Sequence, residues 1–191
     1  MNYIKVKRIM DFFLATFLLV ILAPLILLIY LLVKLTSDGS TIYWSDRYGK
    51  NNVIFKMPKF RTMQINAPVV ASHLLPDPRQ HITFVGRFLR KMSLDELPQI
   101  WSILKGDMSF VGPRPALFSQ ADLVEMRMQR GIHALVPGLT GWAQINGRDD
   151  ISIADKVDYD FQYLEQISLY LDLKILVLTF LKVLVLRGVS H

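Results

Sequence analysis

Hydrophobic positions are concentrated at the two ends of the chain. The N-terminal run "DFFLATFLLVILAPLILLIYLLVK" holds 22 consecutive uncharged residues, 12–33. As a helix at about 1.5 Å per residue, this run extends roughly 33 Å, which is enough to cross the hydrocarbon core of a bilayer. A secretory signal peptide has a shorter apolar region followed by a small-residue cleavage site, and neither feature is present. The pattern therefore predicts a retained membrane segment.

A proline interrupts this run at position 24. Because proline lacks an N–H and its ring clashes with the preceding turn, we expect a kink or a break there. Basic residues flank the run on both sides: Lys5, Lys7, Arg8, Lys34, Arg47 and Lys50. The positive-inside rule then gives a spanning helix no clear direction. Two interpretations stay open, a proline-kinked crossing and a re-entrant helix that returns to the same face.

The second apolar region is the C-terminal segment "YLDLKILVLTFLKVLVLRGVSH". Its longest uncharged stretch, residues 175–181, is too short to span a membrane, because charged residues interrupt the segment. A long helix of this kind lies in the plane of a membrane interface or packs in the core of the domain. The sequence leaves these two alternatives open.

Between the ends, the pattern predicts a mixture of short strands and helices. "TIYWSDRYGKNNVIFKMPKFRTM" predicts two short strands around a turn at residues 49–52. "FVGRFLRKM" predicts a basic amphipathic segment, and "LPQIWSILKG" a helix that ends at Gly106. We expect loops at residues 64–78 and in the Gly/Pro-rich "GDMSFVGPRPA".

Further along, residues 119–130 predict an exposed helix, and "HALVPGLTGWAQINGRDD" predicts a loop and a strand. A helix over residues 152–166 is expected to begin with a capping box made by Ser152 and Asp155. The fold class is therefore mixed α/β, without the long alternation of strands and helices that a Rossmann sheet requires.

Composition narrows the class of protein. At 191 residues, the chain suits one domain plus an anchor. Lys and Arg exceed Asp and Glu by 22 to 16, so the net charge of +6 favours acidic partners. There is no cysteine, which excludes disulfides and thiolate zinc sites, and the four histidines are scattered. We expect no zinc centre.

The segment "KMSLDELPQI" places two carboxylates side by side, Asp95 and Glu96. One interpretation is structural: Ser93 and Glu96 have the spacing of a capping box, and Asp95 would complement the helix dipole. Pro98 weakens this interpretation, because it would fall inside the helix, where its missing donor matters. The alternative is a phosphate-binding site at a helix N-terminus, where a divalent cation lies between the carboxylates and the phosphate.

Basic residues accompany the acid pair, several of them in stiff loops: Arg87, Arg90, Lys91, Lys59, Arg61, Arg114 and Arg148. Each is by itself compatible with a solvated surface charge. A guanidinium held by a Gly/Pro-rich loop, however, suits bidentate contacts with phosphate. Carboxylates, arginines and a membrane anchor together indicate phosphoryl transfer to a lipid, with Mg²⁺ held by one or two carboxylates and diphosphate oxygens.

The runs "KFRTM", "RKMSLDELPQIWSILKGDMSFVGPRP", "PGLTGWAQINGRDD" and "GVSH" closely resemble the bacterial sugar transferases known as monotopic phosphoglycosyl transferases. The resemblance implies a re-entrant membrane helix over residues 1–36, broken at Ala23–Pro24, and a catalytic domain over residues 37–191 with interfacial amphipathic helices. It also implies location at the bacterial inner membrane, with the domain on the cytoplasmic face. The family has a serine before the proline, so Ala23 is a departure that bears on the depth and angle of the helix.

Members of this family transfer a sugar 1-phosphate from a UDP-sugar to undecaprenyl phosphate and release UMP, which begins a surface glycan such as an O-antigen, another polysaccharide or a glycoprotein glycan. By resemblance, Asp95 is the nucleophile that forms an aspartyl phosphosugar and also a Mg²⁺ ligand, with Glu96 as its partner. Arg90, Arg114 and Arg148 match arginines that contact phosphate or substrate, while Lys59 and Arg61 lie in a matched motif. Direct attack by the lipid phosphate is the alternative mechanism.

Overall likeness indicates an N-acetylhexosamine donor. The expected partners are the UDP-sugar, undecaprenyl phosphate and the bilayer, and a homodimer stays open. No nucleic-acid partner is expected, because no recognition motif is present. A basic membrane-tethered binding protein and a plain structural membrane protein are the non-enzymatic alternatives, and neither explains the acids together with the arginines.

Overall fold

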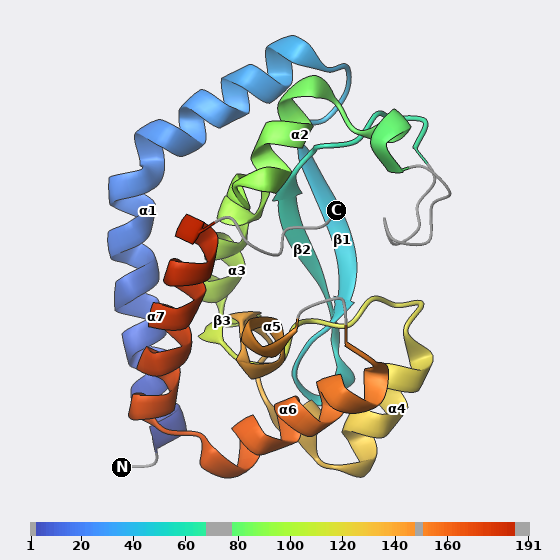
Figure 1. Cartoon of the computed structure of the whole chain (residues 1–191). Coiled ribbons are helices and arrows are strands. Elements are labelled where there is room, and N and C mark those ends of the chain that lie inside the picture. The colour runs from blue at the N-terminus through green and yellow to red at the C-terminus, as the bar shows by residue number, and fades with distance from the viewer. Residues whose placement is uncertain (1–2, 68–77, 148–150, 186–191) are drawn as a thin grey trace.

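The computed structural model of this protein describes residues 3–67, 78–147 and 151–185 (Figure 1). Helix α1 (Tyr3–Thr36) is long and apolar enough to cross a membrane, and it runs through Pro24 as one helix that bends visibly along its length. Only 11% of its most apolar window is buried against the rest of the protein. A core helix would be mostly buried, so the exposed apolar surface supports membrane association. The re-entrant path and the boundary at residue 36 stay predictions.

Helix α1 packs along two separate parts of the core. Ala15 lies in a cluster with Met57 and Ile103, whereas Ile29 and Val33 lie in a second cluster with Phe60. The buried positions recur four residues apart, as expected for one face of a helix. The opposite face of α1 keeps its apolar side chains exposed.

The predicted hairpin is confirmed. Strands β1 (Ile42–Tyr48) and β2 (Ile54–Phe60) pair antiparallel, with Ile42 opposite Phe60, and a single turn, η1 (Lys50–Asn52), joins them. Asn51 and Asn52 both have positive φ, a conformation that asparagine adopts more readily than most residues. In this register, Arg47 lies opposite Phe55 and Lys59 lies opposite Tyr43.

The segment after the hairpin turns back through short helices. It comprises η3 (Pro78–His81), α2 (Phe84–Lys91), η4 (Leu94–Gln99) and α3 (Ile100–Lys105). Thr83 caps α2 by accepting a hydrogen bond from Gly86, and Gly106 ends α3 with a φ of 94°, as the sequence predicted. Within the segment 64–78, residues 68–77 lie outside the described part of the chain.

Two predictions for the central region were incomplete. Strand β3 (Ser109–Val111) lies inside the segment expected to be a loop, and it pairs in parallel with β4 (Gly138–Thr140). Helix α5 (Trp142–Asn146) lies where a loop and a strand were expected. Three-residue strands and a five-residue helix are too short to show a period in the sequence, and all three residues of β3 are buried, which removes any alternation.

Helices α4 (Ala121–Gln129), α6 (Ile153–Gln166) and α7 (Leu169–Val185) complete the fold. The capping box of α6 is confirmed, since Ser152 Oγ accepts the N–H of Asp155 at 3.1 Å. Helix α4 was expected to be exposed, but it buries Leu123 and Arg127 against α6. This correction matters below, because Arg127 has a charged partner there.

Helix α7 fits both of its predicted alternatives in part. Leu171 and Ile175 are buried in the first core cluster. Other apolar side chains of the helix are exposed: Tyr170, Leu173, Val177, Phe180 and Leu181. One face of α7 therefore packs on the domain, while apolar residues on its other side are free for a membrane interface.

Candidate active site

Asp95 and Glu96 lie in η4, a 3₁₀ turn between α2 and α3, rather than in the first turn of a long helix. Ser93 adopts a left-handed conformation with a φ of 55°, and its side chain makes no capping hydrogen bond. The capping-box interpretation is therefore wrong. Pro98 is accommodated because it sits within the same short turn, before α3 begins at Ile100.

Instead of capping a helix, Glu96 binds two cations from distant parts of the chain. Its Oε1 accepts hydrogen bonds from Lys59 Nζ at 2.7 Å and from Arg114 Nη2 at 3.0 Å. The Glu96 side chain is only 16% exposed. Burial by itself would raise the pKa of Glu96, but Lys59 and Arg114 outweigh it and hold that pKa well below the usual range. Glu96 is therefore ionised and holds the side chains of Lys59 and Arg114 next to each other.

Asp95 has different surroundings. It is buried, and within the described residues its carboxylate makes no hydrogen bond or ion pair with another residue. Burial raises the pKa of Asp95, and the charge of Glu96 adds to this, while Lys59 and Arg90 oppose it. A desolvated carboxylate without a side-chain partner is available as a nucleophile or as a metal ligand.

Arg90 approaches the acid pair from α2. Its Nε donates to Thr62 Oγ1 at 2.8 Å, which orients the guanidinium, and its charge acts on Asp95. Burial lowers the pKa of Arg90, and Asp95 partly reverses this effect. The structure thus brings three of the predicted binding residues, Lys59, Arg90 and Arg114, to the two acids.

Two other predicted residues do not join this group in the described structure. Arg61 Nη2 donates to the carbonyl and the hydroxyl of Ser37, each at 3.0 Å, so its guanidinium is attached just beyond the end of α1. Arg148 lies outside the described residues. Contacts of Arg61 or Arg148 with substrate stay predictions.

The sequence did not single out Arg47 as a site residue, yet it lies beside Arg114 and Glu96. Burial and the neighbouring Arg114 lower the pKa of Arg47 to about 10, while Glu96 acts in the opposite direction. Its Nε donates to Ser45 Oγ at 3.0 Å. The signal that could have found it is the alternation of side chains along a strand, which places positions 45 and 47 on the same face of β1. In the structure, Ser45 on that face is buried, whereas Trp44 and Asp46 on the other face are exposed.

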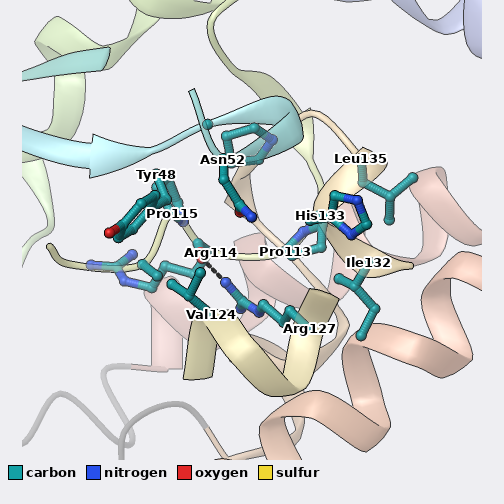
Figure 2. A pocket seen from close by; sticks show the side chains of 13 residues that line it. Tyr48, Asn52, Pro113, Arg114, Pro115, Val124, Arg127, Ile132, His133 and Leu135 are labelled. Carbon is teal, nitrogen blue, oxygen red and sulfur yellow. Dashed lines mark hydrogen bonds between the residues drawn. The ribbon is translucent and has the colours of Figure 1, made fainter. Parts of the chain in front are cut away.

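The loop that carries Arg114 is held by its carbonyl oxygens. Four successive carbonyls, from residues 113–116, accept hydrogen bonds from Gly138 N, Arg127 Nη1, Arg47 Nη1 and Tyr48 N at 2.9, 2.9, 3.2 and 3.1 Å. Figure 2 shows this 113–116 loop beside a small pocket, with Arg127 directed at the Arg114 carbonyl. A loop anchored at every carbonyl fixes the backbone from which the Arg114 side chain projects toward Glu96.

A metal ion at this site would depend on substrate for most of its ligands. The described residues contain no group of three or more histidine or acidic side chains that could hold a metal. Mg²⁺ is commonly held by one or two carboxylates together with substrate phosphate oxygens and water. Asp95 fits that mode as a single carboxylate ligand, whereas Glu96 is already occupied by two cations.

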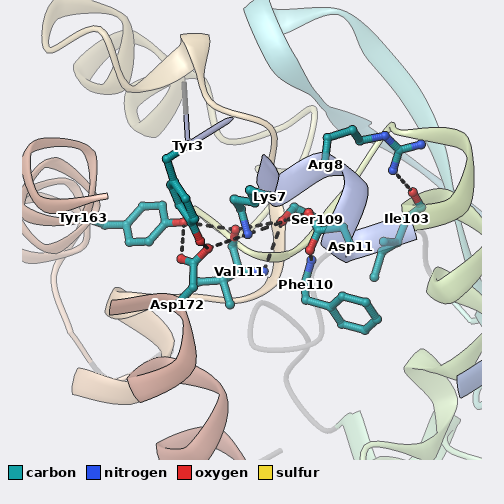
Figure 3. Close-up of polar contacts among 10 residues, drawn as sticks. All are labelled: Tyr3, Lys7, Arg8, Asp11, Ile103, Ser109, Phe110, Val111, Tyr163 and Asp172. Atoms are coloured by element: carbon teal, nitrogen blue, oxygen red, sulfur yellow. Dashed lines mark hydrogen bonds and ion pairs between the residues drawn. The ribbon is translucent and has the colours of Figure 1, made fainter. Parts of the chain in front are cut away.

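A second buried polar cluster attaches the start of α1 to the domain (Figure 3). Lys7 Nζ pairs with Asp172 Oδ2 at 2.8 Å, and Asp11 accepts a hydrogen bond from Ser109 Oγ at 2.7 Å. Arg8 donates to the carbonyls of Ile103 and Leu104 at the end of α3. Lys7 and Arg8 are therefore structural partners of the domain, and Lys5 alone of the three basic residues before the apolar run is exposed.

Comparison with known proteins gives consistent matches over nearly the whole chain. A family model described as "Bacterial sugar transferase" matches residues 2–186. The uncharacterized sugar transferase EpsL of Bacillus subtilis (strain 168) is 42% identical over 185 residues, which cover 97% of this chain and 90% of EpsL.

Two longer relatives carry an activity in their names. The UDP-glucose:undecaprenyl-phosphate glucose-1-phosphate transferase of Escherichia coli (strain K12) is 42% identical over 92% of this chain and 39% of its own length. The UDP-N-acetylgalactosamine-undecaprenyl-phosphate N-acetylgalactosaminephosphotransferase of Aeromonas hydrophila is 36% identical over 91% of this chain and 42% of its own length. The chain thus spans most of EpsL and less than half of these two proteins.

Proposed function

The chain belongs to the bacterial sugar transferase family, and on this premise we propose that it transfers a sugar 1-phosphate from a UDP-sugar to undecaprenyl phosphate and releases UMP. The observation that carries this proposal is the pair of adjacent acids: among the described residues, no side chain forms a hydrogen bond or ion pair with Asp95, whereas Glu96 is bound by two cations. Asp95 would supply the nucleophile, and the two cations bound to Glu96 would supply a positively charged binding site for a diphosphate.

The proposed reaction has two steps at one phosphorus atom. An Asp95 carboxylate oxygen attacks the β-phosphorus of the UDP-sugar, the bond from that phosphorus to the bridging oxygen breaks, and UMP leaves with the electron pair. A phosphate oxygen of undecaprenyl phosphate then attacks the same phosphorus and breaks its bond to Asp95. The burial of Asp95 supports this role, because a carboxylate shielded from water is a stronger nucleophile.

The cations around Glu96 would bind the diphosphate. Lys59 and Arg114 share Glu96 Oε1, and Arg47 lies next to Arg114. In phosphoryl transfer, the protein contributes mainly by positioning the groups and by stabilising the negative charge of the transition state. Glu96 would then act by holding Lys59 and Arg114 in place.

Mg²⁺ is the proposed metal ion, and Asp95 is the residue that would hold it. When bound to a diphosphate, this ion neutralises charge that develops on the phosphate oxygens. The remaining ligands would come from the donor and from water, because Glu96 is bound by Lys59 and Arg114 and only Asp95 is left as a carboxylate ligand.

Exposed apolar side chains support a lipid acceptor close to the site. Phe84 is 90% exposed and Phe88 60%, and both lie on α2, the helix that also carries Arg90. A helix with exposed phenylalanines and basic residues is suited to the surface of a bilayer. We propose that α1 is re-entrant and that the domain lies on the cytoplasmic face of the inner membrane, as the resemblance implies.

The donor sugar is proposed to be an N-acetylhexosamine, and the lipid product to begin a surface polysaccharide or another glycan. Glucose and N-acetylgalactosamine appear in the names of relatives. A donor panel should therefore include UDP-glucose, UDP-galactose, UDP-N-acetylglucosamine and UDP-N-acetylgalactosamine.

The test is UMP release from this panel with Mg²⁺, measured with and without undecaprenyl phosphate. A burst of about one UMP per enzyme without acceptor, and continuous turnover with it, is the result expected for a covalent intermediate. UMP release only when lipid is present would favour direct attack by the lipid phosphate. No UMP from any donor under either condition would refute the proposed function.

A further inference from the structure

Behind the 113–116 loop lies a buried ion pair that the reaction scheme does not use. Arg127 of α4 donates from Nε and Nη2 to Asp160 Oδ2 of α6, at 3.0 and 2.6 Å. Both side chains are buried. The remaining nitrogen of the guanidinium, Nη1, donates to the carbonyl of Arg114 at 2.9 Å (Figure 2). We propose that Arg127 and Asp160 are positioning residues for Arg114, an inference that rests on the proposed function of that arginine.

The geometry of the Arg127 guanidinium carries this inference. A guanidinium is planar, so two nitrogens bound to Asp160 fix the direction of the third. Arg127 is thus oriented by Asp160 before it meets the loop. The two helices that carry the pair also pack together through Leu123 and Val157, in a cluster that includes Ala116 of the loop.

The loop needs such an anchor because of its composition. Pro113 and Pro115 lack backbone N–H groups, so the residues on either side of Arg114 cannot be held through donors of their own. Apart from the N–H of Arg114 itself, the carbonyl oxygens are the backbone groups that can hold this stretch, and Arg127 binds the one that belongs to Arg114.

A continuous set of contacts leads from this anchor to the acids. The carbonyl of Arg114 is fixed by Arg127, and its guanidinium reaches Glu96 Oε1 at 3.0 Å. Lys59 binds the same oxygen. A shift of the Arg114 backbone would therefore move its guanidinium away from the position that it shares with Lys59, without any direct contact between Arg127 and substrate.

A purely structural role, in which the pair only joins α4 to α6, is the competing explanation. The chain offers a matched control for it. Arg130 pairs with Asp158, which links the end of α4 to the same helix α6, and these side chains are 43% and 52% exposed. Within the described residues, Arg130 has no hydrogen bond to the 113–116 loop. Breaking this pair perturbs the same two helices but leaves Arg114 anchored.

The first experiment replaces the buried pair by apolar residues, Arg127→Met with Asp160→Leu, so that no lone charge is left in the interior. Thermal unfolding and UMP release are measured on the full chain. We expect a folded protein whose kcat/KM for the donor falls by about 100-fold. The control, Arg130→Gln with Asp158→Asn, should stay within about twofold of wild type. Equal losses in both variants would overturn the inference.

A double-mutant cycle separates positioning from packing. If the pair acts through Arg114, its replacement in an Arg114→Ala background should cost little further activity, because the group that it positions is already gone. If the pair only stabilises the helices, the two losses will multiply, and the inference fails.

Amide hydrogen exchange tests the same inference without any activity. In the Arg127→Met, Asp160→Leu variant, the amides of Arg114 and Ala116, together with the Tyr48 and Gly138 amides that donate to the 113–116 loop, should exchange faster while most of α4 and α6 keeps its protection. An unchanged loop would overturn the inference. If the wild-type protein releases no UMP from any donor, the proposed function fails while the exchange result still decides the role of the pair.

Discussion

Asp95 and Glu96 are neighbours in the chain, yet the structure shifts the pKa values of their carboxyl groups in opposite directions. Glu96 is bound by Lys59 and Arg114, whereas Asp95 is buried without a side-chain partner among the described residues. The short turn η4 makes this difference, because it directs adjacent side chains to different surroundings. Two identical chemical groups are thereby placed in two different environments.

Asp95→Asn should abolish transfer and keep the fold. The amide cannot act as a carboxylate nucleophile, so turnover with undecaprenyl phosphate should fall by about 10³-fold or more, and the UMP burst should vanish. Because burial raises the pKa of Asp95, the neutral amide should leave the melting temperature at pH 7 equal to or above that of wild type. A lower melting temperature would indicate a structural role instead.

Glu96→Gln should reduce both stability and activity. The change removes the charge that Lys59 and Arg114 share, in a side chain that is 16% exposed, and should lower the free energy of unfolding by about 1–3 kcal/mol. We expect kcat/KM to fall by about 10- to 100-fold, because both cations lose their common partner. Asp107→Asn, in the more exposed pair with Lys105, is the control and should change the stability by less than about 0.5 kcal/mol.

The stability difference between wild type and Glu96→Gln should depend on pH. The pKa of Glu96 is depressed in the folded state, so its contribution is fully present above the unfolded value, about 4.3, and is lost as pH falls toward the folded value. The two proteins should therefore differ by a constant amount from pH 8 to about pH 5 and converge in more acidic solution. Urea unfolding across this range measures the difference, and a gap that widens toward low pH would contradict the assignment.

Arg47→Gln should weaken donor binding more than it weakens folding. The shorter glutamine can still donate to Ser45 Oγ from near the position of Nε, but the hydrogen bond from Nη1 to the Pro115 carbonyl and the charge beside Arg114 are lost. We expect KM for the UDP-sugar to rise by about tenfold with a smaller change in kcat. The exposed Lys50→Gln, at the turn of the same hairpin, is the control. Equal effects of the two changes would remove Arg47 from the site.

The path of α1 through the membrane can be tested with single cysteines, because the natural chain has none. Lys5 and Asp38 are exposed and lie at opposite ends of α1. If the helix is re-entrant, Lys5→Cys and Asp38→Cys should react with a membrane-impermeant maleimide from the same side. Lys50→Cys in the domain reports the cytoplasmic side. Labelling of the two ends from opposite sides would establish a crossing helix.

Much of the local structure could be predicted from the sequence. The hairpin of β1 and β2, the glycine that ends α3 and the cap at Ser152 were all predicted correctly, and the segment that forms α2 was predicted to be amphipathic. Each of these depends on residues only a few positions apart. The apolar run of α1 was equally clear, because a membrane segment is defined by composition and length. Elements as short as β3 and α5 carried no such pattern.

The sequence by itself determined the residue types of the site: two adjacent acids, with Lys59, Arg90 and Arg114 in segments that restrain them. Only the tertiary structure decided how these groups are used. Glu96 meets Lys59 and Arg114 across 37 and 18 positions, and Arg127 meets Asp160 across 33. Periodicity tells which face of an element is buried, but it does not tell which side chain of another element that face will meet. For this reason, the opposite surroundings of the two acids and the anchor of Arg114 became visible only in the folded protein.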